Sequence, residues 1–400
     1  MKVEKIKNTG LCLGCGLCKS LLQEKCEMKI DGEGFYKPFF LSKLSSEEND
    51  LICKVCPGIK IDNSGNETSS IWGNVKKVEN AWASDGFVRK EASSGGVTSS
   101  LAIYLLEQKH VDGVLHVGVQ SDTFLYNKLY LSRNREDVLK RCASRYAPAA
   151  VFDNIVDILD ANPHEKYAFI GKPCDVVAMK NFLRVYPRYK TRILYFLAIF
   201  CAGMPSYNGT LKALDKFKKE RPLDLRYRGD GWPGYFKATY ADGSICKMTY
   251  NESWGTVLNR HLNFRCKICP DGIGALADIA SGDAWNTKDG YPDFTEAAGK
   301  NFCFIRTDAG QKLFDDALKA GYIESENVNV DDVRYMQNYQ YDRRHIVGWR
   351  IAVVQLFTFH GLSFKGLGYN RFALRCNIKK GLRNAWGTFK RMMKSLLYGK

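Results

Sequence analysis

Three cysteines spaced two residues apart constrain this chain more than any other feature of its sequence. Cys12, Cys15 and Cys18 form a Cys-x2-Cys-x2-Cys run with glycine at positions 14 and 16. This spacing lets one tight loop present three thiolates to a [4Fe–4S] cubane, and glycine lets the backbone pass close to such a cluster. The run therefore predicts an iron–sulfur site, and a structural zinc site built from four thiols is the alternative.

The sequence leaves the fourth ligand of this site open. In a bacterial ferredoxin run a Cys-Pro pair follows after three residues, but here that position is Leu22 and the next cysteine is Cys26. A Cys-Pro pair occurs instead at Cys56, with Cys53 three residues before it. We therefore treat Cys26, Cys53 and Cys56 as further candidate ligands.

Cys266 and Cys269 form another Cys-x2-Cys pair far downstream. Together with Cys26 or Cys53 they could complete a second cluster, which would fix the N-terminal segment to the rest of the chain. Half of a zinc ribbon, or core cysteines that bind nothing, are the alternatives. The candidate metal ligands are thus Cys12, Cys15, Cys18, Cys26, Cys53, Cys56, Cys266 and Cys269.

The absence of export and membrane signals bears on the meaning of the 14 cysteines. The first seven residues alternate charged with single apolar side chains, which is not a secretory signal. The longest apolar run, Ile193 to Met204, is shorter than the roughly 20 residues that cross a bilayer. We expect a cytoplasmic protein, in which structural disulfides are disfavoured and cysteine spacing indicates metal binding or redox chemistry.

The middle of the chain alternates between strand-like and helix-like segments. Strands are expected at 75–83, 113–119, 167–170 and 193–200, and helices at 97–109, 152–159 and 207–219, with a further helix that follows the turn 171–175 and ends at about 183. Strand, short glycine turn and helix in succession predict an α/β layer with a mainly parallel sheet. The Asp242-Gly243 pair near the centre of residues 235–250 predicts an antiparallel hairpin inserted into this body.

Two glycine turns carry candidate cofactor-binding residues at the expected carboxyl ends of strands. They are Ser94-Gly95-Gly96 and Gly171-Lys172-Pro173-Cys174, and each precedes a helix. A helix N-terminus offers N–H groups and a positive dipole to phosphate, and two such turns at one sheet edge form a nucleotide-binding crevice. Together they predict a dinucleotide such as FAD, whereas a glycine turn that binds nothing is the alternative. Neither the Rossmann nor the P-loop pattern is present, so NAD in the usual fold and ATP hydrolysis are not expected.

Positive charge is concentrated at the C-terminal end. Residues 341–400 contain 13 Lys and Arg against the single acid Asp342, while the whole chain has a net charge of +16. Twelve of these cations (Arg343, Arg344, Arg350, Lys365, Arg371, Arg375, Lys379, Lys380, Arg383, Lys390, Arg391 and Lys394) are interleaved with Trp349, Phe357, Phe359, Phe364, Phe372, Trp386, Phe389, Leu396 and Leu397. The mixture is typical of an amphipathic helix on an anionic membrane surface. Nucleic acid is less favoured because the apolar residues are too many and too large, and a solvated helix packed on the body is a further alternative.

The sequence resembles the beta-subunit family of coenzyme F420 hydrogenases and dehydrogenases, which also contains the 7-hydroxymethyl chlorophyll a and divinyl chlorophyllide reductases. The similarity covers about residues 8–310. It is carried by the run from Cys12 to Cys18 with Cys26 and Gly34-Phe35-Tyr36, by Ser94-Gly95-Gly96, by Ala143-Ser144-Arg145-Tyr146-Ala147-Pro148, by Gly171-Lys172-Pro173-Cys174, by Cys201-Ala202-Gly203-Met204-Pro205-Ser206, and by Cys266 and Cys269 with residues 277–283. The resemblance implies a flavin enzyme with FAD and one or two [4Fe–4S] clusters, and it adds Ser144, Arg145 and Tyr146 to the candidate cofactor-binding residues.

These observations predict an oxidoreductase with a ferredoxin-type segment at 1–62, an FAD-binding body at 71–340 and a basic tail at 341–400. A flavin accepts two electrons as hydride while a cubane passes one at a time, so the pair converts between them. The expected substrate is a small organic molecule or a glycan precursor, and the expected partners are a ferredoxin or other redox protein and an anionic membrane surface. An electron-transfer subunit that feeds a separate catalytic partner, and a zinc-stabilised interaction protein, remain as alternatives.

Overall fold

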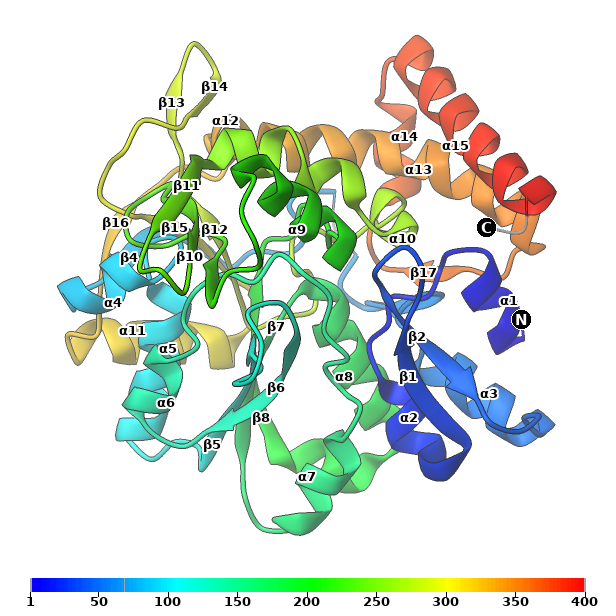
Figure 1. Cartoon of the computed structure of the whole chain (residues 1–400), viewed down its shortest axis with the longest axis horizontal. Helices are drawn as coiled ribbons and strands as arrows, with labels where there is room; N and C mark the ends of the chain where they lie inside the picture. The colour runs from blue at the N-terminus through cyan, green and yellow to red at the C-terminus, as the bar shows by residue number, and fades with distance from the viewer. Residues whose placement is uncertain (1, 68, 399–400) are drawn as a thin grey trace.

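A mixed eight-stranded sheet forms the centre of the body (Figure 1). The computed structural model describes residues 2–67 and 69–398, except for the side chains of 395–398. The strand order is β16-β4-β15-β12-β8-β7-β5-β6, in which β12, β8, β7 and β5 run parallel and the flanking pairs are antiparallel. The expected α/β class is confirmed, and the sheet is mixed because antiparallel strands extend it at both edges.

Four of the eight strands of this sheet lie close to segments expected from the sequence, and the other four were not predicted. The eight strands are β4 (Lys77–Ala83), β5 (Gly113–Val119), β6 (Asn127–Ser132), β7 (Tyr167–Gly171), β8 (Ile193–Ile199), β12 (Ile279–Asp283), β15 (Asn301–Ile305) and β16 (Ile323–Asn327). The smaller pairs are β1 (Cys26–Ile30) with β2 (Tyr36–Phe40), β13 (Asn286–Lys288) with β14 (Tyr291–Asp293), and β17 (Ser363–Lys365) with β3 (Lys60–Asp62).

Helices cover both faces of the large sheet, with α5 and α11 on one side and α8 on the other (Figure 1). Along β7, Tyr167 and Phe169 enter one hydrophobic cluster while Ala168 enters a second, as expected for side chains that alternate across a strand. The helices of the body are α4 (Gly86–Glu91), α5 (Val97–Glu107), α6 (Arg135–Leu139), α7 (Ile155–Ala161), α8 (Pro173–Val185), α9 (Tyr207–Leu214), α10 (Phe264–Lys267), α11 (Asp308–Lys319) and α12 (Val333–Met336). Helix α9 is shorter than expected because the chain turns at Lys218, which has a φ of 52°.

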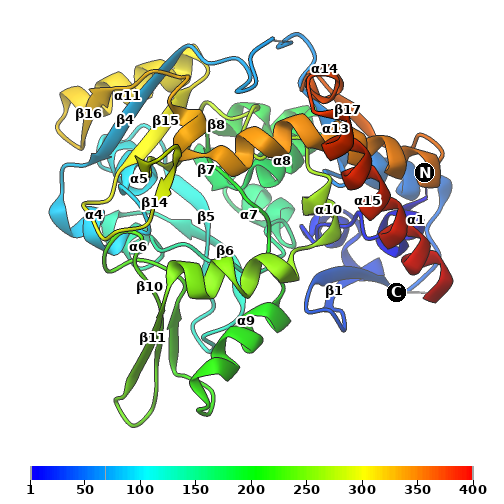
Figure 2. The ribbon, with the colours of Figure 1, turned by 90° about the horizontal axis from the view of Figure 1, so that it is seen from above.

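The expected hairpin insertion is present as a three-stranded sheet. Strands β9 (Asp224–Arg226), β10 (Tyr235–Thr239) and β11 (Ile245–Thr249) form it, and Gly243 supplies the positive φ of the β10–β11 turn. Figure 2 shows that this hairpin projects from the body. Its inner face has a hydrophobic cluster of its own, which includes Tyr227, Phe236 and Leu258.

The N-terminal segment has more regular structure than its sequence pattern suggested. It contains α1 (Val3–Asn8), α2 (Leu17–Leu22), α3 (Ser46–Val55) and the β1–β2 hairpin. Val3, Leu22 and Ile52 form a small buried cluster with Cys26, so this segment has a small apolar core of its own. A capping box between Ser45 and Glu48 begins α3.

Helix α13 (Asn338–Thr358) crosses the domain boundary expected at residue 340. It buries Val347, Ile351 and Val354 in the main hydrophobic core. Strand β17, which follows α13 in the chain, pairs with β3 of the N-terminal segment. Helices α14 (Tyr369–Leu374) and α15 (Ile378–Tyr398) follow. The first half of the expected basic tail is therefore packed into the body, while the division into three domains stays a prediction.

We expect the replacement Ile351→Ala to lower the free energy of unfolding by about 2–4 kcal/mol, because it removes a buried side chain from a packed core. Ile351 is 2% exposed, whereas Leu356 on the same helix is 69% exposed. Leu356→Ala should therefore change stability by less than about 0.5 kcal/mol. Denaturant unfolding of both variants checks this, and equal effects would show that α13 is not anchored in the core.

Candidate functional site

Four thiols meet at the N-terminal segment, and we call Cys12, Cys15, Cys18 and Cys56 the N-terminal quartet. Burial, followed by the charges of neighbouring quartet thiols, raises the pKa of Cys15 and Cys18 well above the ordinary value and that of Cys56 to about 12. Cys12, Cys15 and Cys56 also pack against the same hydrophobic cluster, which places the cysteine of the displaced Cys-Pro pair near the Cys-x2-Cys-x2-Cys run.

The glycines of this run are required for packing against other parts of the chain. Gly14 and Gly16 have φ values of 69° and 91°. A Cβ atom on Gly14 would lie 2.4 Å from the Tyr36 carbonyl oxygen, and one on Gly16 would lie 2.6 Å from the backbone nitrogen of Asp153. The loop is held further by the Phe152 N–H, which donates to the Cys15 carbonyl at 2.7 Å.

Cys26 and Cys53 lie beside the N-terminal quartet rather than beside Cys266 and Cys269. Both pack in the small cluster around Val3, whereas Cys266 packs with Phe35 and Met204. The structure therefore does not assemble the second site from Cys26 or Cys53, which the sequence had suggested as companions of Cys266.

A second group of thiols lies where the body meets α10, and we call Cys174, Cys201, Cys266 and Cys269 the inner quartet. Cys174 is in the first turn of α8, Cys201 follows β8, and the other two belong to or follow α10. Burial and the charges of Cys266 and Cys269 raise the pKa of Cys201 to about 12, although the cations Lys172 and Arg343 act against this shift. Burial and the charges of Asp175 and Cys201 raise the pKa of Cys174. The backbone N–H of Met204 donates to the Cys266 sulfur at 3.4 Å.

Of the inner quartet, the sequence pattern predicted only Cys266 and Cys269 as metal ligands. Cys174 was assigned to the flavin and Cys201 to no metal site, because neither has a cysteine partner at close spacing. Both follow parallel strands directly, and that position was the available signal, since the carboxyl ends of such strands meet at one edge.

Buried arginines surround the two quartets. Arg343 of α13 donates to the carbonyls of Cys201 at 3.1 Å and Cys266 at 2.7 Å, and Arg265 donates to the Gly58 carbonyl at 2.6 Å. Arg344 donates to the Pro270 carbonyl at 2.6 Å. Burial lowers the pKa of Arg344, and the charge of the buried Asp271 carboxylate acts against this shift. Positive charge in this buried region is therefore partly balanced by a carboxylate.

A crevice runs over the carboxyl edge of β5, β7 and β8. It consists of two cavities of about 130 and 160 Å³ that share Ser144, Arg145, Ala147, Lys172 and Ile199 as a common wall. We call the first the aromatic half and the second the α5 half. This is the edge at which α/β sheets bind ligands. Because two cavities share one wall, the crevice suits an elongated molecule with a different chemical group at each end.

Planar side chains line the aromatic half. Tyr146, Tyr250, Trp254 and Trp285 contribute to it, and the rings of Tyr146 and Trp254 have centroids 5.0 Å apart. Behind them Arg228 and Asp283 form a buried two-pronged ion pair at 2.8 and 2.9 Å, and the Trp232 indole N–H donates to Asp283 at 2.8 Å. This pair fixes the wall on which a ring could stack.

Polar groups line the α5 half. Thr98 and Ser99 belong to the first turn of α5, and Lys172 and Arg141 supply cations. The Lys172 ammonium is 2.6 Å from the Asp175 carboxylate. Burial would lower the pKa of Lys172, but Asp175 and the Cys174 thiol raise it, so this side chain remains a cation. A helix N-terminus with two cations suits a phosphate group.

The expected phosphate turn Ser94-Gly95-Gly96 lies behind this half rather than in its lining. A Cβ atom on Gly95 would meet the Asn301 backbone nitrogen at 2.7 Å, and the Asn301 side chain donates to the Ser94 hydroxyl at 2.9 Å. The glycines therefore let the turn pack against β15, and the residues that reach the crevice are the next ones along α5.

The other expected cofactor residues divide between crevice and support. Gly171, Lys172, Ser144, Arg145 and Tyr146 line the crevice, while Pro173 begins α8 and Cys174 belongs to the inner quartet. The Arg145 guanidinium already donates to Asn127 and to the carbonyls of Leu225 and Phe124, each at 2.8 Å. Through these hydrogen bonds Arg145 holds in place the wall that the two cavities share.

The crevice and the two quartets adjoin one another. Cys201 lines the aromatic half and also belongs to the inner quartet. Asp175, which follows Cys174, lines the α5 half and its charge acts on the Cys15 thiol of the N-terminal quartet. Both quartets therefore lie near the crevice.

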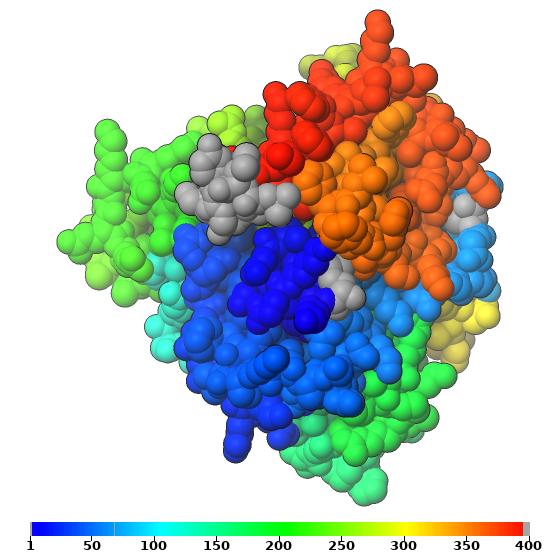
Figure 3. All heavy atoms as spheres, turned by 90° about the vertical axis from the view of Figure 1, so that its right-hand side faces the viewer, coloured from blue at the N-terminus to red at the C-terminus, as the bar shows by residue number. Residues whose placement is uncertain are grey.

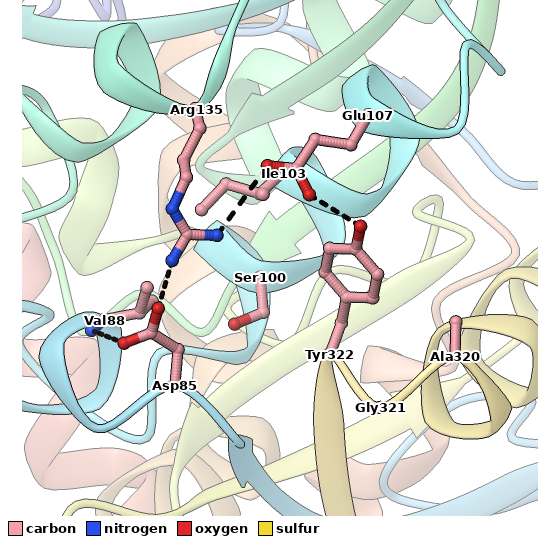
Figure 4. A pocket seen from close by; sticks show the side chains of 9 residues that line it. All are labelled: Asp85, Val88, Ser100, Ile103, Glu107, Arg135, Ala320, Gly321 and Tyr322. Carbon is pink, nitrogen blue, oxygen red and sulfur yellow. Dashed lines mark hydrogen bonds and ion pairs between the residues drawn. The ribbon is translucent and has the colours of Figure 1, made fainter.

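A separate cavity of about 220 Å³ lies near the other end of α5 (Figure 4). Its charged groups are satisfied by one another: Arg135 pairs with Asp85 and with Glu107 at 3.8 Å, and the Tyr322 hydroxyl donates to Glu107 at 2.6 Å. The charged side chains of this cavity are therefore paired with one another.

Among the described residues, no three His, Cys, Asp or Glu side chains are placed to hold a single metal ion.

Comparison with known proteins agrees with these features. Residues 78–155 match the N-terminal model, and residues 164–331 the C-terminal model, of the coenzyme F420 hydrogenase/dehydrogenase beta subunit. The coenzyme F420 hydrogenase subunit beta of Methanococcus voltae is 27% identical over 66% of this chain and 88% of its own length. The F420-dependent formate dehydrogenase subunit beta of Methanocaldococcus jannaschii is 26% identical over 60% of this chain and 59% of its own.

The fold is also similar to that of a solved structure. A chain of the F420-reducing [NiFe] hydrogenase complex from Methanosarcina barkeri matches with a TM-score of 0.56 and 20% identity, over 75% of this chain and 98% of that one. The two family models, the sequence relatives and the similar fold indicate the same family. The relatives named above are subunits of oxidoreductases. The chain belongs to the family of coenzyme F420 hydrogenase/dehydrogenase beta subunits.

Proposed function

We propose that this protein is an iron–sulfur flavoprotein that transfers electrons between a redox partner and a two-electron carrier or substrate in the crevice. The observation that carries the proposal is the double position of Cys201, which belongs to the inner quartet and also lines the aromatic half of the crevice. A redox group held by the inner quartet would lie directly beside a ring in the crevice.

The donor set of each quartet fits a [4Fe–4S] cluster. Such a cluster takes four cysteine thiolates and is an anion, and burial of an anion requires nearby positive charge. Arg343 and Arg265 supply that charge, and both donate to backbone carbonyls, while the buried Nε of Arg343 has no hydrogen-bond partner among the described residues. The N-terminal quartet would thus hold one cluster and the inner quartet a second one. Cys26 and Cys53, also expected as ligands, would support the first from outside.

The crevice fits a flavin dinucleotide such as FAD. The α5 half would bind the phosphates through the first turn of α5 and Lys172, and the aromatic half would bind the ring against Tyr146 and Trp254. A bound flavin supplies exchange between hydride and single electrons. The protein's part is to orient that ring beside Cys201 and to exclude water with the aromatic wall.

The relatives favour an electron-transfer subunit over an independent reductase, because those named above are subunits of larger enzymes. We propose a ferredoxin or another iron–sulfur protein as the redox partner, which would exchange electrons through the N-terminal quartet. The small organic or glycan-precursor substrate stays a prediction. An anionic membrane surface, the further partner expected from the sequence, would be met by the C-terminal helix rather than by the crevice.

We expect Cys201→Ser to lose about four irons per chain, one cubane, while the chain remains folded. The measurement is iron, acid-labile sulfide and zinc analysis of anaerobically purified protein, with the optical spectrum between about 400 and 450 nm where clusters and flavins absorb. Cys246→Ser is the matched control, because Cys246 lies on β11 of the projecting hairpin. Zinc in place of iron, or unchanged iron in Cys201→Ser, would contradict the assignment.

We expect Ser99→Asp to abolish flavin binding, because its carboxylate would occupy the position assigned to phosphate. Ser99 is the third residue of α5, where an acidic side chain stabilises a helix, so the variant should fold as the parent does. Ala309→Asp places the same charge in the first turn of α11 and should leave flavin content unchanged. Flavin released from equal amounts of each protein is measured, and full retention by Ser99→Asp would place the phosphates elsewhere.

A further inference from the structure

Helix α15 exposes an apolar stripe along its length. Ile378, Leu382, Trp386 and Phe389 are spaced four, four and three residues apart, and their exposed fractions are 67%, 55%, 57% and 37%. Residues at this spacing share one helix face. Leu374, just before the helix, is 86% exposed. We call the four helical side chains the α15 stripe.

The neighbouring face of α15 packs on α13. Gly381, Thr388 and Met392 are buried there, and a Cβ atom on Gly381 would lie 2.5 Å from the Trp349 ring. Arg350 of α13 donates to the Asn384 side chain at 2.7 Å. Phe389, at the edge of the stripe, also contacts Phe357 of α13, with ring centroids 5.6 Å apart. These contacts fix the orientation of the helix, so that Ile378, Leu382 and Trp386 are held outward.

Cations flank the stripe. Lys379, Arg383, Lys390, Arg391 and Lys394 are all exposed, and α15 contains no acidic residue from Ile378 to Tyr398. The Lys390 ammonium lies 5.2 Å from the centre of the Trp386 ring. Long basic side chains beside an outward aromatic stripe can place their charges above an apolar surface. The expected apolar residues Leu396 and Leu397 fall outside the described side chains.

We propose that α15 is a docking surface for an anionic lipid membrane, with the α15 stripe in the headgroup boundary and the flanking cations on lipid phosphates. The charge of the helix is the complement of such a surface, and its apolar residues give the side-on geometry of an interfacial helix. Among the described residues, no helix is long and apolar enough to cross a bilayer, so the proposed contact is peripheral.

The contact would also orient the electron path. Figure 3 shows α15, the end of α13 and the N-terminal segment gathered on one face of the molecule. Leu356 and Phe359 near the end of α13 are 69% and 83% exposed, and the Lys5 ammonium of α1 lies 4.3 Å from the centre of the Phe359 ring. A protein resting on α15 would therefore hold the N-terminal quartet, rather than the crevice, toward the membrane side.

The test is co-sedimentation of the full-length, iron-loaded protein with vesicles of phosphatidylcholine containing phosphatidylglycerol. The protein should pellet at low ionic strength and be released as salt rises beyond about 0.1 M, where the Debye length is about 10 Å. Vesicles of phosphatidylcholine alone should retain much less. The variant with Ile378→Ser, Leu382→Ser and Trp386→Ser should bind at least about tenfold more weakly, because three exposed side chains no longer enter the lipid boundary.

A matched control replaces three side chains of similar exposure elsewhere. Leu223, Ile245 and Tyr291 are 69%, 58% and 68% exposed, and their triple replacement by serine should bind vesicles as the parent does. Unchanged spectra and melting temperatures in both triple variants show that they fold. The proposal is overturned if the parent does not bind anionic vesicles or if the stripe variant binds equally well. Self-association or capture of an acidic redox protein through the stripe, without vesicle binding, would also overturn it.

Discussion

Burial of positive charge beside the cysteine quartets is the constraint on which this structure depends. Arg265, Arg343 and Arg344 are nearly inaccessible, and each donates to backbone carbonyls beside the cysteine quartets. A buried cation without a balancing charge costs several kcal/mol; the buried Asp271 carboxylate acts on Arg344, and a further anion in the same region would stabilise the fold. Two thiolate-ligated clusters would supply it. The proposed cofactors thus explain why helix α13, which lies beyond the residues matched by the family models, is packed into the body.

The parallel centre of the sheet is what brings the chemistry to one place. Strands β5, β7, β8 and β12 end at the same edge, and the residues that follow β7 and β8 supply Lys172 and Cys201. Strand β4 points the same way, because two antiparallel steps through β15 restore its direction. Helix α5, which comes after β4 in the chain, therefore has its N-terminus at this edge, although β15 separates β4 from the parallel strands.

Much of the fold could be predicted because strand and helix periodicity is local information. The β5 segment was expected at its observed bounds, and the hairpin followed from Asp242 and Gly243. The inner quartet could not be predicted in full, because Cys174, Cys201 and Cys266 come from three separate elements whose meeting depends on sheet order. The same holds for the buried half of the basic tail: the charges of Arg343 and Arg344 indicated solvent, and only tertiary packing shows that they are enclosed.

The central claim is that two four-cysteine clusters lie in series with the crevice, close enough to exchange electrons. Electron paramagnetic resonance of the chemically reduced protein tests it most directly. The account predicts two paramagnetic clusters whose signals are broadened by mutual magnetic interaction, and a single unbroadened signal in Cys15→Ser, in which the N-terminal quartet is incomplete. A single cluster in the unmodified protein, or two clusters without detectable interaction, would contradict it.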